Sequence, residues 1–280
     1  MEYNMWESIW IWASNTIIPK RDKKTIMKPS PAVRTAGHQA KHTRRIRGEV
    51  VWKISKIVLS VIICMAFILA LVSAFTFYFI SGYINSIAQA HVVSIYNNNV
   101  SQMSPDIQMD LLNAAHECNE HLSGNSGRFW VTADDTVKYS DLLNVNGGGV
   151  MCLLDIPKLK IKVPVYHGTD AATLKNGIGH LQGSSLPVGG PGTHAVIAGH
   201  RGEPSAHFFE HLDKLVIGDK FMITVLNETL TYEVDQVLVV DPDDYSALQI
   251  VPGDDYVTLM TCTPYGSNSY RLLVRGYRVS

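Results

Sequence analysis

The feature that most constrains this chain is an apolar run from Ile57 to Ile80 that contains no Asp, Glu, Lys or Arg. As a helix the run would extend about 36 Å, enough to cross a hydrocarbon core of about 30 Å with some tilt. The run is longer than the apolar region of a cleaved signal peptide, and no convincing small-residue cleavage site follows it. A buried core helix is the other alternative. Because a spanning helix satisfies its own backbone hydrogen bonds in lipid, the sequence predicts a transmembrane helix over 57–80.

Charge is distributed unevenly on the two sides of this run. Residues 1–56 hold twelve Lys and Arg against four acidic residues, whereas the rest of the chain holds twelve against 21. No Lys or Arg follows the run until Arg128. The positive-inside rule therefore predicts a cytoplasmic N-terminus and an extracellular region from about residue 81. The basic segment is interpreted as a contact with anionic membrane lipid, and no nucleic-acid partner is expected.

The region beyond the membrane begins with a helical pattern. Between 81 and 122 apolar residues recur near the 3.6-residue period of a helix, and Asn97-Asn-Asn99 and Ser104-Pro105 interrupt the pattern. Ser104 is a suitable helix cap and Pro105 a suitable first helical residue. Residues 128–148 lack a pattern and are expected to form a loop.

From Val150 onward, short β-rich segments alternate with turn signals such as Pro157, His167-Gly168 and Pro252-Gly253. Seven or eight short strands at this spacing, with only short helices near 171–176 and 206–214, are typical of an all-β sandwich or closed barrel. The predicted strands cover 150–156, 163–166, 194–198, 220–226, 229–240, 256–261 and 271–279.

Cys262 lies where the predicted strand 256–261 ends, and Arg271 lies where the next strand begins. Two strands joined by the intervening loop would place both residues at the same end of a sheet. A thiol that faces a guanidinium indicates a nucleophile with an electrostatic helper, because the cation favours the thiolate. The alternative is a small buried cysteine and a surface arginine.

His200 also lies at a strand exit, since it follows an apolar strand through Gly199 and precedes the turn Arg201-Gly202. It would supply the acid and base partner for a thiolate nucleophile at Cys262. The alternative for this residue is a structural histidine.

The other cysteines do not form a metal-ligand pattern. Cys64 lies inside the predicted membrane helix, and three cysteines remain outside it. In an extracellular compartment three cysteines cannot all pair, so a Cys118–Cys152 disulfide is a candidate that would leave Cys262 free.

A rival site is the segment His207-Phe-Phe-Glu210-His211, which matches the H-x-x-E-H pattern of inverted zinc peptidases. On a helix the two histidines would lie one turn apart and could share a metal ion. No good third ligand is present in the sequence, so a solvated helix face is the default and no metal is expected. A metallopeptidase remains as an alternative.

Several of these segments together resemble the sortases, and more specifically the class C sortases that polymerise pilins. The resemblance runs from about Tyr139 to Tyr277. The segments that carry it are Thr258-Leu-Met-Thr-Cys262-Thr-Pro-Tyr-Gly with Arg271-Leu-Leu-Val-Arg-Gly276, Gly199-His200-Arg201-Gly202-Glu203-Pro204-Ser205, Pro164-Val165-Tyr166-His167-Gly168-Thr169, and Gly179-His180-Leu181-Gln182-Gly183-Ser184-Ser185-Leu186-Pro187.

The resemblance implies an all-β, eight-stranded sortase-type barrel with a catalytic triad of Cys262, His200 and Arg271. It also implies a cysteine transpeptidase that needs no cofactor. The expected substrate is a Leu-Pro-x-Thr-Gly-like sorting signal, cut between Thr and Gly and joined to a Lys amine of another pilin. Two alternatives remain: attachment of surface proteins to the amine of the peptidoglycan cross-bridge, and a non-catalytic assembly barrel in which Cys262 is a core thiol.

Other site residues are expected from the loops that would border the triad. The substrate-binding candidates are Ala198, Thr261, Thr263, Tyr265 and Asn268.

The resemblance leaves two alternatives for the segment before the barrel: an altered lid, or no lid at all. Class C sortases usually carry one that is anchored by Asp-Pro and an aromatic residue, but no such tripeptide occurs between 100 and 140. Phe129 and Trp130 are the candidate anchor of an altered lid.

We therefore expect four regions along the chain. They are a cytoplasmic basic segment over 1–56, the transmembrane helix over 57–80, an extracellular helical or linker region over 81–138, and the catalytic barrel over 139–280. Many class C sortases have a second membrane helix at the C-terminus, whereas this chain is expected to be anchored only through 57–80.

Overall fold

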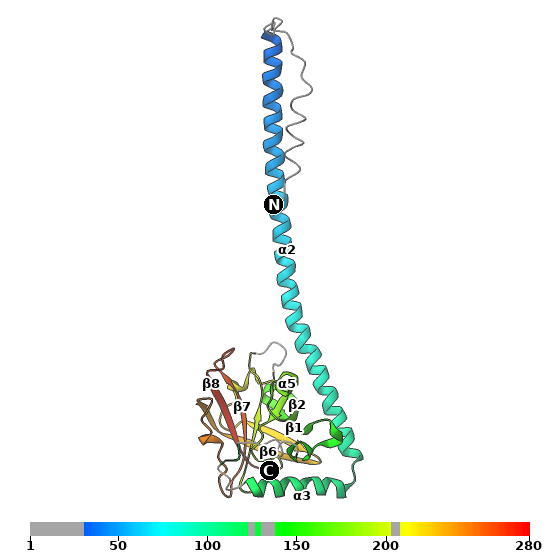
Figure 1. Cartoon of the computed structure of the whole chain (residues 1–280), viewed down its shortest axis with the longest axis vertical. Coiled ribbons are helices and arrows are strands. Elements are labelled where there is room, and N and C mark those ends of the chain that lie inside the picture. Colours follow the sequence, from blue (N-terminus) through cyan, green and yellow to red (C-terminus); the bar gives the residue numbers. More distant parts are fainter. Residues whose placement is uncertain (1–30, 123–126, 130–137, 203–207) are drawn as a thin grey trace, which may run out of the picture. The chain divides into compact units, whose positions relative to one another are not determined.

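The computed structural model describes residues 31–122, 127–129, 138–202 and 208–280 (Figure 1). By their internal contacts, the residues divide into two compact units, 1–70 and 71–280. The described part of the first unit is helical throughout, and the second unit holds the barrel.

Helix α2 runs from Pro31 to Gln102, and its segment Lys41–Phe77 is long and apolar enough to cross a membrane. The interruption predicted at 97–99 is wrong, because α2 continues through it. Tyr96 explains the continuity: its hydroxyl donates to the backbone oxygen of Met151 (3.2 Å) and accepts from the backbone nitrogen of Leu226 (2.8 Å). These contacts with the barrel outweigh the weak helix propensity of three asparagines.

Helix α3 (Pro105–Leu122) begins as predicted, with Pro105 as its first residue. The hydroxyl of Ser104 accepts a hydrogen bond from the backbone nitrogen of Ile107 (3.4 Å) and so caps the helix. The side chain of Asn119 on α3 is buried against the barrel, donating to the Leu186 backbone oxygen and accepting from its nitrogen. The region after the membrane run is therefore packed on the barrel.

Eight strands form a closed barrel in the order β1-β2-β3-β4-β7-β8-β6-β5, which confirms the predicted fold class. The strand that the sequence pattern missed is β3, which is only three residues long. The strands are β1 (Val150–Ile156), β2 (Ile161–His167), β3 (Ile178–His180), β4 (Thr193–Ala198), β5 (Lys220–Val225), β6 (Glu228–Val240), β7 (Asp255–Thr263) and β8 (Tyr270–Arg278).

Short helices connect the strands. The helix predicted near 171–176 is α5 (Ala171–Asn176), capped by the side chain of Asp170. A short helix was also predicted near 206–214. The described part of that range, 208–214, contains no α-helix: it is a turn followed by the one-turn 3₁₀ helix η3. The 3₁₀ helices are η1 (Val145–Gly147), η2 (Pro157–Leu159), η3 (Leu212–Lys214) and η4 (Ser246–Leu248).

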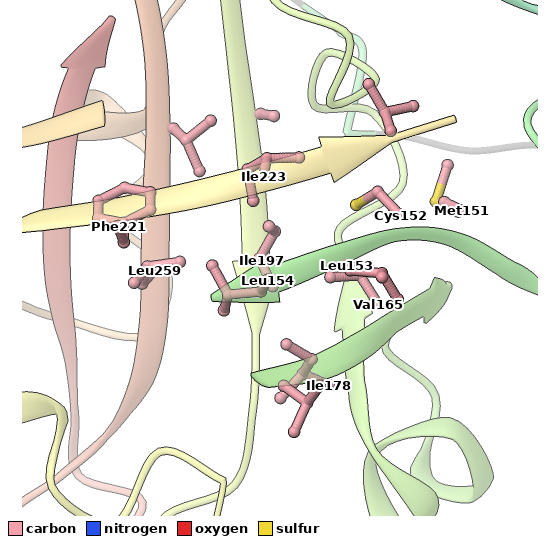
Figure 2. Packing of buried hydrophobic residues seen from close by; sticks show 14 of the residues in the cluster. Met151, Cys152, Leu153, Leu154, Val165, Ile178, Ile197, Phe221, Ile223 and Leu259 are labelled. Carbon is pink, nitrogen blue, oxygen red and sulfur yellow. The ribbon is translucent and has the colours of Figure 1, made fainter. Parts of the chain in front are cut away.

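The wall made by β4, β7 and β8 has two different faces. Side chains on its inner face, such as Ile197 and Leu259, belong to the main core inside the barrel. Figure 2 shows them among side chains from β1, β2, β3 and β5. On the outer face Val196 and Leu273 form a second apolar cluster, here called the outer cluster. Its other members are Leu248, Phe129, Leu181, Leu238, Val240, Ala247 and Met260.

The candidate disulfide between Cys118 and Cys152 is not present, because both residues are free thiols. Cys152 lies on β1 inside the main core, fully buried, and Cys118 lies on α3, half-buried. Burial raises the pKa of both thiols, so neither is inclined to form the reactive thiolate.

Candidate active site

The register of three neighbouring strands brings His200, Cys262 and Arg271 into one row. Strands β4 and β7 are parallel and pair Ala198 with Met260, so extending this register by two residues brings His200 beside Cys262. Strands β7 and β8 are antiparallel and pair Cys262 directly with Arg271. Because neighbouring strands lie about 4.8 Å apart, Cys262 and Arg271 are direct cross-strand neighbours, and the extended register puts His200 next to them.

The row lies on the outer face of the barrel wall. Paired residues in a sheet project to the same side, and residues two apart along a strand share a side. Met260 pairs with Leu273, and both belong to the outer cluster. Cys262 and Arg271, two residues further along each strand, therefore face outward beside this apolar cluster.

His200 is held next to β7 by backbone contacts. The nitrogen of Gly199 donates to the oxygen of Met260 (3.1 Å), which continues the sheet past the end of β4. The hydroxyl of Thr261 donates to the oxygen of Gly199 (2.7 Å). The imidazole therefore leaves the sheet at a fixed point, and it is half-buried.

The guanidinium of Arg271 is oriented by its own loop. Its Nη1 donates to the backbone oxygens of Asn268 (3.1 Å) and Tyr270 (3.2 Å). Within the part of the chain that the structure describes, no carboxylate pairs with Arg271. Its positive charge is thus free to stabilise a thiolate or an oxyanion nearby.

Two other histidines have structural roles that distinguish them from His200. His194 on β4 is buried, with Nε2 2.7 Å from the hydroxyl oxygen of Thr258 and Nδ1 2.9 Å from the Gln249 backbone oxygen. His180 on β3 is fully buried. Burial lowers the pKa of each to about 4, so both are neutral at pH 7.

The five substrate-binding candidates differ in exposure. Ala198 and Thr261 are buried, and the Thr261 hydroxyl is occupied by Gly199. Tyr265 is 55% exposed and its hydroxyl lies 3.4 Å from a Glu210 carboxylate oxygen. Asn268 is also exposed.

The fifth candidate, Thr263, is half-buried. Its hydroxyl oxygen accepts a hydrogen bond from Arg201. Sequence reasoning assigned no role to Arg201, although its position directly after His200 is a signal that could have identified it.

Phe129, one of the two lid-anchor candidates, packs on the outer cluster. Its ring stacks on Tyr245 with centroids 5.2 Å apart, and the preceding Arg128 donates through Nη2 to the backbone oxygen of Leu248 (2.6 Å). A short segment before the barrel therefore covers part of the face that carries Cys262. The second candidate, Trp130, lies outside the described residues.

The rival metal site has no support in the described ranges, where no group of three His, Cys, Asp or Glu is arranged to hold a metal ion. His207 lies outside these ranges. Glu210 is in contact with the Tyr265 hydroxyl, and His211 is exposed in a turn.

Comparison with known proteins identifies the family of this barrel. A family model described as "Sortase domain" matches residues 154–279. The crystal structure of sortase C1 from Streptococcus agalactiae is 44% identical, with 68% of this chain and 98% of that chain covered and a TM-score of 0.65. Sortase C of Streptococcus pneumoniae is 39% identical, with 68% and 97% covered and a TM-score of 0.62.

Curated relatives agree at lower coverage. Sortase D of Bacillus subtilis (strain 168) is 30% identical over 131 residues, which are 46% of this chain and 63% of that protein. The chain spans between 41% and 63% of the length of the curated relatives that it matches. The chain therefore belongs to the sortase family, as a class C sortase.

Proposed function

We propose that this chain is a membrane-anchored cysteine transpeptidase that joins a sorting signal of one pilin to a lysine of another. The observation that carries this proposal is the row of His200, Cys262 and Arg271 on adjacent strand ends. The similarity to sortases C supports the pilin substrate, since the sortase C of Streptococcus pneumoniae is described as having pilin substrate specificity.

The first half-reaction forms a thioacyl enzyme on Cys262. The thiolate sulfur attacks the carbonyl carbon of the Thr in a Leu-Pro-x-Thr-Gly-like signal, and Arg271 donates hydrogen bonds to the oxyanion that develops. His200 gives a proton to the leaving amine of Gly as the Thr–Gly bond breaks. The amide is exchanged for a thioester, so no cofactor is required.

The second half-reaction transfers the acyl group to an amine. The lysine of the acceptor pilin attacks the thioester carbonyl, and His200 takes up the proton that the amine loses. The new amide bond forms as the carbon–sulfur bond breaks, which returns Cys262 to its starting state. The reaction proceeds by acyl transfer alone.

The apolar segment of α2 supports anchoring in the cell membrane, because it is long enough to span the bilayer. The excess of basic residues before it favours a cytoplasmic N-terminus and an extracellular barrel. This arrangement would present the site to substrates on the outer face of the membrane.

We also propose that Phe129 anchors a lid over the substrate face. Its stacking on Tyr245 and its packing on the outer cluster support this role. Substrate entry would then require the segment around Phe129 to move, and Tyr265 and Asn268 would contact the bound peptide from the opposite loop.

The test mixes the full-length protein in detergent with a sorting-signal donor and two competing amines. One amine is a pilin domain that carries its acceptor lysine, and the other is a cross-bridge peptide. The proposal predicts a donor–pilin amide and no product with Cys262→Ala. A cross-bridge product would instead identify an anchoring sortase, and activity in Cys262→Ala would overturn the cysteine mechanism. A folded protein that forms neither product, and whose Cys262 resists iodoacetamide, would indicate a non-catalytic barrel.

A further inference from the structure

Arg201 lies in the turn directly after His200, and its side chain is only 10% exposed. A guanidinium this well covered needs partners for its hydrogen-bond donors, because an unpaired buried charge is costly. Its contacts therefore indicate what the side chain holds together.

The donors of Arg201 reach two separate segments. Nε donates to the backbone oxygen of Glu210 (3.2 Å), and Nη2 lies 3.0 Å from Oδ1 of Asp213. Nη1 donates to the hydroxyl oxygen of Thr263 (3.1 Å). One planar group thus joins the turn after His200, the segment 210–213 and the end of β7. We refer to these three contacts as the Arg201 fork.

A second link lies on the other side of the row. There the Thr261 hydroxyl donates to the oxygen of Gly199 (2.7 Å). Both link residues of β7 are direct neighbours of Cys262, and both of their partners are direct neighbours of His200. The thiol and the imidazole are therefore bracketed by two side-chain links between the same two segments of the chain.

We propose that Arg201 is a positioning residue for the transpeptidation proposed above, on which this inference rests. The fork holds the turn of His200 against the end of β7, so that the imidazole stays within proton-transfer reach of Cys262 and the reacting amine. Placement at this precision matters, because a displacement of about 1 Å at a reacting group can cost about 100-fold in rate.

The charge of Arg201 is compensated, and this separates its role from that of Arg271. Asp213 pairs with Arg201, whereas Arg271 has no carboxylate partner among the described residues. Arg201 therefore acts through geometry, while Arg271 supplies the charge that faces the substrate.

The experiment measures kcat, KM and the pH profile of kcat/KM for four variants of the full-length protein. Thr263→Val removes only the acceptor hydroxyl, Arg201→Met removes the whole fork, and Arg201→Lys keeps the charge without the planar donors. The double variant Arg201→Met/Thr263→Val tests whether the two residues act through their contact.

We expect Arg201→Met to lower kcat on the order of 10- to 100-fold, with KM changed less than about threefold, and to alter the shape of the pH profile. Thr263→Val should lower kcat in the same way but less, and the double variant should be no slower than Arg201→Met. Arg201→Lys should resemble Arg201→Met.

The matched control is Arg275→Met on β8. Arg275 is also mostly buried and is bound through both Nε and Nη2 to Asp235. It lies further along β8 than Leu273, on the side away from Arg271 and Cys262. This variant should lose thermal stability while kcat stays within about twofold, since it removes an ion pair of similar burial that does not touch the row.

A folded Thr263→Val protein with unchanged kcat would overturn the proposal, as would full activity in Arg201→Lys or strictly additive losses in the double variant. Thr263→Val keeps the side-chain shape and decides the question even if Arg201→Met does not fold. Cys262→Ala is run in parallel, because activity in that variant would contradict the proposed function and not the fork.

Discussion

The two faces of the β4–β7–β8 wall are built from alternating residues of the same strands, yet they serve different purposes. The inner face consists of apolar side chains such as Ile197 and Leu259, which are completely buried. The outer face starts with an apolar cluster around Val196 and ends in the polar row that includes Cys262. The same strands therefore both stabilise the barrel and place Cys262 next to Arg271 on its outer face.

The cysteines of the barrel illustrate the contrast. Cys152 lies inside the main core, where burial raises its pKa and leaves it a small apolar residue. Cys262 is partly exposed at a strand end and pairs with Arg271. Position in the sheet, rather than the residue type, decides which thiol can act as a nucleophile.

The largest expected effect separates two histidines of the same segment: His194, which lies within β4, and His200, which lies two residues beyond its end. His200→Gln should lower transpeptidation by about 10³-fold with little change in melting temperature, because it removes an acid and base. His194→Gln should lower the melting temperature while the folded protein keeps its kcat, because His194 joins Thr258 to Gln249. Similar effects of both variants on kcat would contradict the distinction.

A pair of neighbours on β7 tests the two faces directly. Leu259→Ala should lower the free energy of unfolding by about 2–5 kcal/mol, since it opens a cavity in the main core. Met260→Ala, on the outer cluster, should cost only about 1 kcal/mol, because Met260 is partly exposed, and it should raise KM for the donor peptide. Urea denaturation and steady-state kinetics measure both quantities, and an equal loss of stability would show that the outer face is also core.

Low pH should weaken the barrel through its buried histidines. His180 and His194 have pKa values of about 4 in the folded protein, below the value of about 6.5 of an unfolded chain. The unfolded state binds more protons between these values, so stability is complete above pH 6.5 and falls as the pH drops toward 4, by about 3 kcal/mol for each histidine.

Urea unfolding at several pH values tests this window. His194→Gln should remove about half of the decline, because only His180 then remains to be protonated. An unchanged decline in that variant would assign the acid sensitivity to other groups.

The smallest expected effect concerns Phe129, which packs on the outer cluster. Phe129→Ala should speed the alkylation of Cys262 by iodoacetamide about fivefold, because a stacked aromatic pair contributes about 1 kcal/mol to the closed position. Tyr245→Leu should have a similar effect, since it removes the other ring of the stack. A rate that is unchanged in both variants would show that Phe129 does not limit access.

The sequence predicted the barrel well because its strands are long and bounded by clear turn signals. β1 begins and ends where the pattern indicated, at Val150 and Ile156. β3 was missed because three residues are too few for a two-residue period to be visible. The helix break at 97–99 was predicted wrongly because Tyr96 makes its decisive contacts with distant residues.

The row of His200, Cys262 and Arg271 was also predictable, because Cys262 and His200 each follow an apolar run at the end of a strand. The contacts around the row were not predictable in the same way. The link between Arg201 and Thr263 spans 62 positions, and the stack of Phe129 on Tyr245 depends on how two loops fold over the outer face. Arg201, Thr263 and Phe129 could each be singled out in the sequence, but which residue each one contacts follows only from how the barrel closes.

The most direct test of the account maps the covalent intermediate. The full-length protein in detergent is incubated with a Leu-Pro-x-Thr-Gly donor peptide without an acceptor, quenched in acid, digested and analysed by mass spectrometry. The account predicts the acyl adduct on Cys262 alone, with Cys64, Cys118 and Cys152 unmodified, and its disappearance when a lysine acceptor is added. An adduct on another cysteine, or none on Cys262 while peptide is still cleaved, would contradict the account.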